Sequence, residues 1–228
     1  MILGITGGSG CGKTTALEAV RDLGGLVLDC DAIYHDLLSR SPSLLAAIDR
    51  RFPGVVSQSG LDRKKLGRLV FSDAEALQDL NRIAHGAVKA EVLARLTAHP
   101  PPLAAIDAIA LFEGGLAELC QYTVAVTAPW EDRITRLMSR EGISRDYAEA
   151  RLRAQHDGSY FQRLCDFTLE NNGAKDAFYQ TARTLILQLL GSAPDCEGAF
   201  DHTNPKPTIF KEDHHCLLYT SPSPRDCS

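Results

Sequence analysis

The 228-residue sequence lacks long hydrophobic runs, an excess of positive charge and paired cysteine motifs. Its longest apolar stretch, residues 103–112, is interrupted by Asp107 and is too short to cross a bilayer. Met1 leads directly into apolar residues without a basic segment, so we expect no secretory signal. A formal net charge of -5 argues against a nucleic-acid coat protein and against a basic membrane-surface binder. These absences favour a small-molecule partner over nucleic acid or membrane.

The seven cysteines are scattered, and no pair has the Cys-x-x-Cys spacing of zinc sites or thioredoxin-type motifs. Free thiols in a chain without a signal predict a reducing, cytoplasmic location. Cys11 lies in a glycine-rich segment, where a small side chain in a tight turn and a redox thiol are both open interpretations. The chain has no internal repeats, and we expect a monomer or a weak homo-oligomer.

The composition, with 44% hydrophobic and 23% charged residues, is typical of a globular protein with a buried core. An apolar run at residues 2–6 precedes a glycine-rich loop, and apolar residues then recur at helical spacing over residues 17–23. Residues 26–28 form another apolar run that predicts a buried strand. Strand, helix and strand within about 30 residues make a βαβ unit, which predicts a parallel sheet.

Further apolar runs predict strands at residues 104–111, 123–127 and 167–169, and a helical pattern spans residues 74–96. The alternation predicts a doubly wound α/β fold with a parallel sheet of about five strands. We expect an all-helical insertion at roughly residues 35–100.

Periodicity fails from about residue 194, where Pro, Asp, His, Ser and Thr dominate, so residues 194–228 are predicted to be a disordered tail that follows a domain of residues 1–193. Residues 216–228 read like the translation of a transposase sequencing adapter. We interpret them as an artefact rather than as an ordinary polar tail and leave them out of the fold prediction.

The segment Gly7-x-x-x-x-Gly12-Lys13-Thr14 matches the phosphate-binding P-loop and has the required context, a strand before it and a helix after it. Glycines let the backbone wrap a triphosphate and aim its N–H groups inward at a helix N-terminus. Lys13 is expected to reach the β- and γ-phosphates, and Thr14 to ligate Mg²⁺. The alternative is a glycine-rich turn without a ligand. The predicted ATP-binding residues of the loop are Gly8, Ser9, Gly10, Cys11, Gly12, Lys13, Thr14 and Thr15.

Two acids, Asp29 and Asp31, follow the predicted strand at residues 26–28. If the backbone stays extended there, both carboxylates project to one face, because strand side chains alternate. Such a carboxylate can accept a hydroxyl proton or hold a Mg²⁺-bound water. The alternative for Asp31 is a helix cap before Ala32. With the P-loop nearby, we interpret Asp31 and Asp29 as catalytic candidates.

Arg133, Arg136 and Arg140 form a stripe on one predicted helix after Pro129. Arginine is concentrated over residues 133–163, which suits a segment that closes over phosphates. Six acids also lie over residues 131–163, so a solvated surface face is the alternative.

Three further side chains have two interpretations each. Glu113 and Asp107 could each be an acid that acts beside the P-loop, or a solvated acid at a strand end. His85 lies on the long predicted helix, where a structural histidine and a ligand contact are equally open.

Beyond the P-loop, several short motifs occur in a specific order. They are Gly-Ile-Thr-Gly-Gly-Ser-Gly-Cys-Gly-Lys-Thr at 4–14, Leu-Asp-Cys-Asp-Ala at 28–32, Gly-x-Asp-Arg at 60–63, Val-Phe-Ser-Asp at 70–73, Leu-Asn-x-Ile-x-His at 80–85, Leu-Phe-Glu-x-Gly-Leu at 111–116, Arg-x-x-x-Arg-Glu-Gly-Ile-Ser at 136–144, Arg-x-x-x-Gln at 151–155 and Cys-Asp-Phe-Thr-Leu-Glu-Asn at 165–171. In this order and spacing, the chain resembles the dephospho-CoA kinase family from Ile2 to about Leu190.

The resemblance implies a P-loop kinase fold and transfer of the ATP γ-phosphate to the ribose 3′-hydroxyl of dephospho-CoA, the last step of coenzyme A synthesis. It implies that Asp31 receives or orients the hydroxyl and that Asp29 helps to organise the Mg²⁺ shell. It further implies a lid at about residues 129–163. The remaining implied site residues are Arg63, Phe71 and His85 for the acceptor, Arg136 and Arg140 in the lid, and Asn171 near the adenine.

The sequence departs from the family at two places. Gly86 stands where a proline is common after the histidine, and residues 107–110 replace a usual Val-Pro-Leu. Both concern the acceptor side more than the phosphate chemistry. Two other functions stay open: a uridine- or shikimate-type kinase, and a P-loop GTPase switch. The switch would carry an Asn-Lys-x-Asp guanine motif, which the chain lacks.

Overall fold

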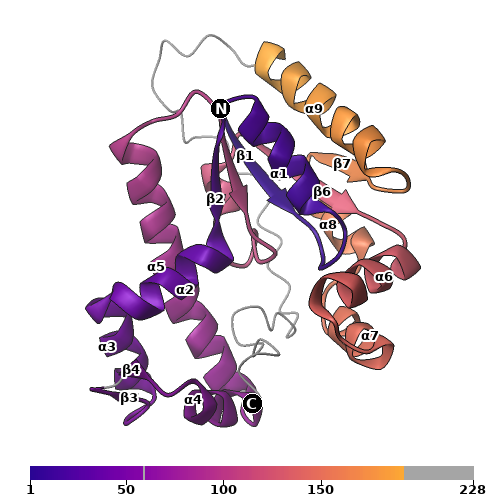
Figure 1. Ribbon diagram of the computed structural model, residues 1–228. Coiled ribbons are helices and arrows are strands. Elements are labelled where there is room, and N and C mark those ends of the chain that lie inside the picture. Colours follow the sequence, from indigo (N-terminus) through magenta and orange to yellow (C-terminus); the bar gives the residue numbers. More distant parts are fainter. Residues whose placement is uncertain (59, 193–228) are drawn as a thin grey trace.

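The computed structural model describes residues 1–58 and 60–192 of the chain. A parallel five-stranded sheet runs through the molecule in the order β2-β5-β1-β6-β7 (Figure 1). Because the chain crosses from β1 to strands on both of its sides, the expected doubly wound α/β fold with about five parallel strands is confirmed. The strands are β1 (Ile2–Thr6), β2 (Leu26–Asp29), β5 (Ala104–Asp107), β6 (Tyr122–Thr127) and β7 (Phe167–Glu170).

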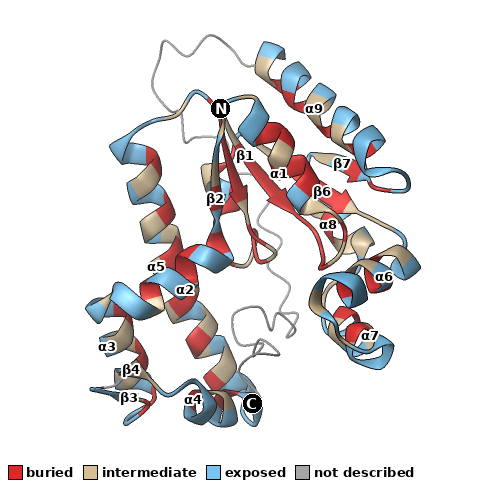
Figure 2. Ribbon diagram, in the orientation of Figure 1, coloured by how far each residue is buried: buried red, intermediate tan, exposed pale blue. Residues whose placement is uncertain are grey.

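Each face of the sheet has its own hydrophobic core, because neighbouring strand residues point to opposite faces. Leu3 of β1 belongs to a cluster with α1 (Lys13–Asp22) and α9 (Lys175–Ser192). Ile106 of β5 belongs to the other cluster, with α5 (Ala74–Ala98). Figure 2 shows the buried residues along the central strands and on the sides of these helices that face them.

The chain between β2 and β5 forms the insertion, which lies to one side of the carboxyl edge of the sheet (Figure 1). Helix α5 covers the predicted residues 74–96 and packs against the other three helices. The expectation of an all-helical insertion is wrong, because Val56 and Leu61 pair in a short antiparallel ladder. The elements before α5 are α2 (Cys30–Arg40), α3 (Pro42–Arg51), β3 (Val56–Ser57), β4 (Gly60–Leu61) and α4 (Arg63–Phe71).

Helices α6 (Trp130–Glu141), α7 (Arg145–Arg153) and α8 (Gly158–Leu164) connect β6 to β7 and lie on the other side of the same edge (Figure 1). We call these three helices and the loops that join them, residues 130–164, the lid. Helices α6 and α7 share a small core of their own, formed by Ile134, Leu137, Ala148 and Leu152. The phosphate loop after β1 therefore lies between the insertion and the lid.

The predicted strand at residues 104–111 is shorter than expected, since β5 ends at Asp107. Both neighbouring strands end at or near this position: Asp107 lies opposite Asp29, the last residue of β2, and opposite Ile5, the last residue but one of β1. Beyond Asp107 the chain turns, and Gly114 N donates to Ala110 O at 2.9 Å. The remaining residues of the run are apolar because they are buried, not because they are a strand.

Among the described residues, no helix is both long and apolar enough to cross a bilayer. The predicted tail at residues 194–228, with the adapter-like residues 216–228, lies outside the described part of the chain.

Candidate active site

The loop between β1 and α1 forms a backbone cradle at the carboxyl end of β1. Gly12 has a φ of 101°, and a Cβ at this position would lie 2.1 Å from Asn171 Nδ2. Only glycine tolerates this left-handed, crowded position. No side chain of the described residues caps the start of α1, so the helix N-terminus is available to an anion.

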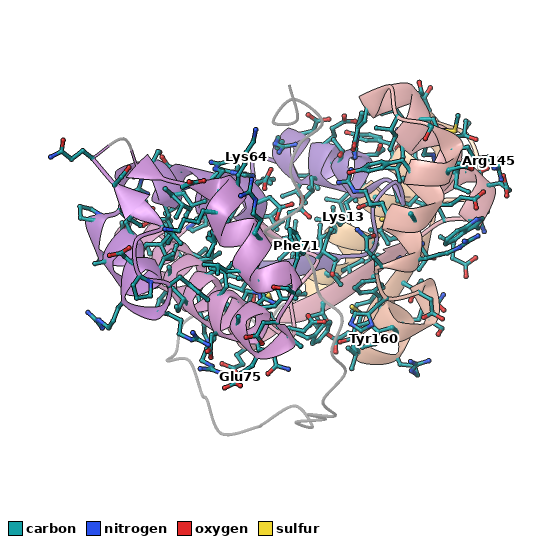
Figure 3. All side chains as sticks on the ribbon, turned by 90° about the horizontal axis from the view of Figure 1, so that it is seen from below. Lys13, Lys64, Phe71, Glu75, Arg145 and Tyr160 are labelled. Atoms are coloured by element: carbon teal, nitrogen blue, oxygen red, sulfur yellow. The ribbon has the colours of Figure 1, made fainter. Side chains whose placement is uncertain are left out.

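Lys13, the first residue of α1, bends back over this loop, and its Nζ donates to Gly7 O at 2.8 Å. Thr14 beside it is exposed, whereas Thr15 is buried. In Figure 3, Lys13 lies between the insertion and the lid. The predicted phosphate-binding residues are thus together in one loop that is open at Lys13 and Thr14.

The backbone at the end of β2 places Asp29 and Asp31 differently from the prediction. Asp29 ends β2, and its Oδ1 accepts a hydrogen bond from Ala32 N at 2.9 Å, which caps α2. Asp31 lies in the first turn of α2 and is not in extended backbone. The prediction that strand alternation aligns the two carboxylates is therefore wrong, and so is the capping interpretation of Asp31. The reason is local: the chain becomes helical at Cys30, one residue after the cap.

Asp31 nevertheless has the electrostatic surroundings of a proton acceptor. Burial and, after it, the Asp29 carboxylate raise the pKa of Asp31, while the charges of Lys13 and Arg151 oppose the rise. The side chain keeps an exposed surface, so its loss of hydration is partial. A carboxylate whose pKa is raised binds a proton more readily, which is what a general base needs.

Asp107 lies beside the phosphate loop, because β5 pairs directly with β1. Its Oδ1 is buried and has no hydrogen-bond partner among the described residues. Burial, together with Asp29 and Asp31, raises the pKa of Asp107 to about 6 against the opposing charge of Lys13. The interpretation as a solvated strand-end acid is wrong for Asp107.

The oxygen donors near the loop fit a magnesium ion. Asp107 offers a buried oxygen without a partner, and the exposed Thr14 offers a hydroxyl. Among the described residues, no group of three or more His, Cys, Asp or Glu side chains could form a metal cage. Mg²⁺ suits such a sparse site, since it is usually held by one or two protein oxygens, by phosphates and by water.

The lid brings one of its two predicted arginines to the loop. Arg136 Nη1 donates to Gly10 O at 3.2 Å and to Cys11 O at 3.4 Å. Arg140, one turn further along α6, pairs with Glu141 instead and is exposed. The interpretation as a solvated face therefore holds for the end of α6 but not for the part that packs on the loop.

Asn171 follows β7 and reaches the loop from the side opposite to Asp107 in the strand order. It is 5% exposed, and its Nδ2 donates to Cys11 O at 3.0 Å. Its Oδ1 is buried and has no partner among the described residues. The contact with Cys11 supports a role at the nucleotide side, while a place near the adenine stays a prediction.

The predicted acceptor residues are on the insertion. Arg63 begins α4 and is exposed, and Phe71 ends the same helix with 54% of its surface exposed. In Figure 3, Phe71 lies at the border of the insertion nearest to Lys13. His85 lies on α5, and burial lowers its pKa while Glu113 opposes that effect. The neutral form of His85 is therefore favoured at neutral pH.

Glu113, the second acid with an open interpretation, is engaged by the lid. Tyr160 of α8 donates its hydroxyl to Glu113 Oε1 at 2.9 Å, and His156 Nε2 lies 3.5 Å from the same oxygen. The rings of His156 and Tyr160 stack with their centroids 3.7 Å apart. Glu113 is thus a link between the sheet and the lid, and not a solvated acid.

Two polar residues that the sequence analysis did not assign also hold the loop. Gln155 Oε1 accepts from Ser9 N at 2.9 Å, and Gln155 Nε2 donates to Ser9 Oγ at 2.8 Å. Arg133 Nε donates to Ser9 O at 2.9 Å. Gln155 ends the Arg-x-x-x-Gln motif, and Arg133 begins the arginine stripe, so both residues lie in patterns that the sequence shows. Neither pattern indicated the loop as the partner.

Comparisons with known proteins agree with this geometry. The family model for dephospho-CoA kinase matches residues 1–176. Dephospho-CoA kinase from Thermus thermophilus is 34% identical over 198 residues, which cover 87% of this chain and 96% of that protein. The enzyme from Anaeromyxobacter dehalogenans is 38% identical over 195 residues, or 83% of this chain and 92% of that protein.

Solved structures show the same likeness. The crystal structure of TT1252 from Thermus thermophilus has a TM-score of 0.70 and 34% identity, with 83% of this chain and 97% of that chain covered. Dephospho-CoA kinase from Campylobacter jejuni has a TM-score of 0.59 and 25% identity, with 84% and 98% covered. With a phosphate loop between an insertion and a lid, and with this agreement over most of its length, the chain belongs to the dephospho-CoA kinase family and is an ATP-dependent kinase.

Proposed function

We propose that this protein transfers the γ-phosphoryl group of ATP to the ribose 3′-hydroxyl of dephospho-CoA, with Asp31 as the proton acceptor. The observation that carries the proposal is the place of Asp31. It lies on α2 at the carboxyl edge of the sheet, within electrostatic reach of Lys13 from the phosphate loop and of Arg151 from the lid. The parts that would hold donor and acceptor thus meet at this carboxylate.

In the reaction, the 3′-hydroxyl gives its proton to the Asp31 carboxylate and its oxygen bonds to the γ-phosphorus. The bond from that phosphorus to the β–γ bridging oxygen breaks, and ADP leaves with the electron pair. Lys13 and the loop N–H groups stabilise the charge on the phosphoryl oxygens, as phosphoryl transfer requires. Arg136 holds the loop backbone at Gly10 and Cys11 while the lid excludes water.

Bound Mg²⁺ would neutralise part of the charge on the β- and γ-phosphoryl oxygens. The oxygen donors that would hold it are Thr14, Asp107 and, through water, Asp29. We rank Asp107 above Asp29 here, because Asp29 Oδ1 already caps α2 whereas Asp107 Oδ1 has no partner among the described residues.

On the acceptor side, we infer that Arg63, Phe71 and His85 bind dephospho-CoA. The exposed aromatic ring of Phe71 suits contact with a nucleoside, and the charge of Arg63 suits its phosphates. Asn171 and Arg140 remain our candidates for the adenine side and the closed lid. For the whole chain we infer a kinase domain of residues 1–193, with the insertion at about 35–100 and the lid at about 129–163.

We further infer a cytoplasmic protein that acts as a monomer or a weak homo-oligomer. Four cysteines of the described part are free thiols, and three of them are buried, which suits a reducing compartment.

The experiment is an ADP-release assay with ATP, Mg²⁺ and a panel of acceptors. Dephospho-CoA should support turnover, whereas CoA should not, because its 3′-hydroxyl is already phosphorylated. Shikimate and uridine test the other kinase functions. Equal turnover with either of them, or ADP release that does not depend on any acceptor, would contradict the proposal.

A further inference from the structure

Arg133 lies against the phosphate loop on the inner side of α6. Its side chain is 7% exposed, and its Nε donates to Ser9 O at 2.9 Å. A Cβ on Gly8 would lie 2.2 Å from Arg133 Nη2, and a Cβ on Gly10 would lie 2.7 Å from Arg133 O. The arginine and the loop therefore fit together only because positions 8 and 10 are glycines.

The guanidinium of Arg133 has no counter-charge among the described residues. Nearby acids of the lid pair with other arginines: Glu131 with Arg145, and Glu141 with Arg151. The Nη2 atom of Arg133 is buried and has no hydrogen-bond partner in the same part of the chain. Burial accordingly lowers the pKa of Arg133. A buried cation without a partner is unfavourable for the folded protein.

Ser9 is the point at which the lid holds the loop. Its backbone N–H and hydroxyl bind Gln155, and its carbonyl oxygen binds Arg133. Three polar groups of one loop residue are thus bound by two lid side chains that lie more than 120 positions away in the sequence. Gln155 can supply a donor and an acceptor but no charge, so the charge of Arg133 needs a separate explanation.

We propose that Arg133 is a nucleotide-positioning residue, which holds the loop through Ser9 and whose charge is balanced by the polyphosphate of a bound nucleoside triphosphate. The proposal rests on the proposed function only in assuming that the loop binds ATP. The bound polyphosphate is a multiply charged anion beside a poorly hydrated cation, and their attraction is strong where water is excluded. Binding of the polyphosphate therefore offsets the cost of the unpaired charge of Arg133, which favours the nucleotide-bound state.

The test is Arg133→Met, which keeps the length of the side chain and removes both charge and N–H donors. The melting temperature without nucleotide should stay equal or rise, because the unpaired charge is gone. The rise in melting temperature on adding ATP or inorganic tripolyphosphate should shrink, and KM for ATP should increase about tenfold while kcat changes less. Arg133→Lys keeps the charge and should recover most of the affinity.

The matched control is Arg153→Met, which removes an exposed lid arginine that pairs with Glu149. It should leave both the melting temperature and KM for ATP near the parent values. A purely structural Arg133 would give a lower melting temperature in Arg133→Met with an unchanged ATP-induced shift, and that result overturns the inference. Unchanged ATP affinity in Arg133→Met overturns the inference about Arg133 and leaves the proposed function intact. A parent protein that does not bind ATP overturns both.

Discussion

The charge of Asp107 should help catalysis and weaken the fold, and this opposition can be measured. The folded pKa of about 6 stands about 2 units above the ordinary 3.8, because the carboxylate is buried beside Asp29 and Asp31. One unit corresponds to about 1.4 kcal/mol, so ionised Asp107 costs at most about 3 kcal/mol of folding stability above pH 6. A folded pKa that is raised means that this cost falls as the pH drops through about 6 and vanishes near 3.8.

Asp107→Asn removes the charge while keeping the shape. The buried amide of the variant would itself lack a hydrogen-bond partner, which reduces the gain in folding stability by about 1 kcal/mol. We therefore expect a net stabilisation of about 1–2 kcal/mol at pH 8 without Mg²⁺, or about 2–8 °C in melting temperature for a domain of this size. In the same variant, kcat should fall by about 10²-fold or more, because a donor for Mg²⁺ is lost.

The assay is a pair of thermal melts of parent and variant at pH 8 and pH 4.5 in EDTA, with kcat measured at pH 8 in Mg²⁺. The control is Glu170→Gln, which neutralises the exposed acid at the end of β7 and should move the melting temperature little. The reasoning is refuted if Asp107→Asn melts below the parent protein at pH 8, or if the gap between them does not narrow at pH 4.5.

Four more variants have expected outcomes. Lys13→Ala should lower kcat by about 10²- to 10³-fold with little change in the melting temperature, and near-normal turnover would end the phosphate-site assignment. The parent should lose kcat/KM as the pH falls through the raised pKa of Asp31, and Asp31→Asn should lower kcat by about 10²-fold and abolish this pH dependence. Asp29→Ala should instead cost about 1 kcal/mol of folding stability, because the cap of α2 is lost. If Asp29→Ala lost kcat and Asp31→Asn lost stability, Asp29 would be the proton acceptor and Asp31 the structural residue. Glu113→Gln should weaken the contact with Tyr160 and destabilise the protein most above pH 4.5. The destabilisation should shrink as the pH falls below 4.5, because the folded pKa of Glu113 is lowered; equal destabilisation at pH 3.5 in a melting experiment would contradict this.

Two predictions were wrong about where a strand ends, because the residues that follow can either continue the strand or leave it. The apolar run at residues 104–111 reads as one strand, yet strand pairing stops at Asp107, where β2 ends and β1 has one residue left. The Asp29–Asp31 segment reads as extended, yet the chain becomes helical at Cys30 and makes Asp29 the cap. Hydrophobicity reports burial, and burial does not distinguish a strand from the turn that follows it.

The sequence by itself determined the phosphate loop, because the backbone cradle and the helix start that follows it are made by contiguous residues with glycine at the strained positions. It likewise determined the five strands of the parallel sheet, apart from the end of β5, and the long helix of the insertion, because these patterns are local. Tertiary structure alone decided which side chains hold that loop. Arg133 and Gln155 reach Ser9, Asn171 reaches Cys11, and Asp107 comes beside the loop because β5 pairs with β1. These contacts join residues about 100 or more positions apart, and they depend on the order of the strands, which no local preference encodes.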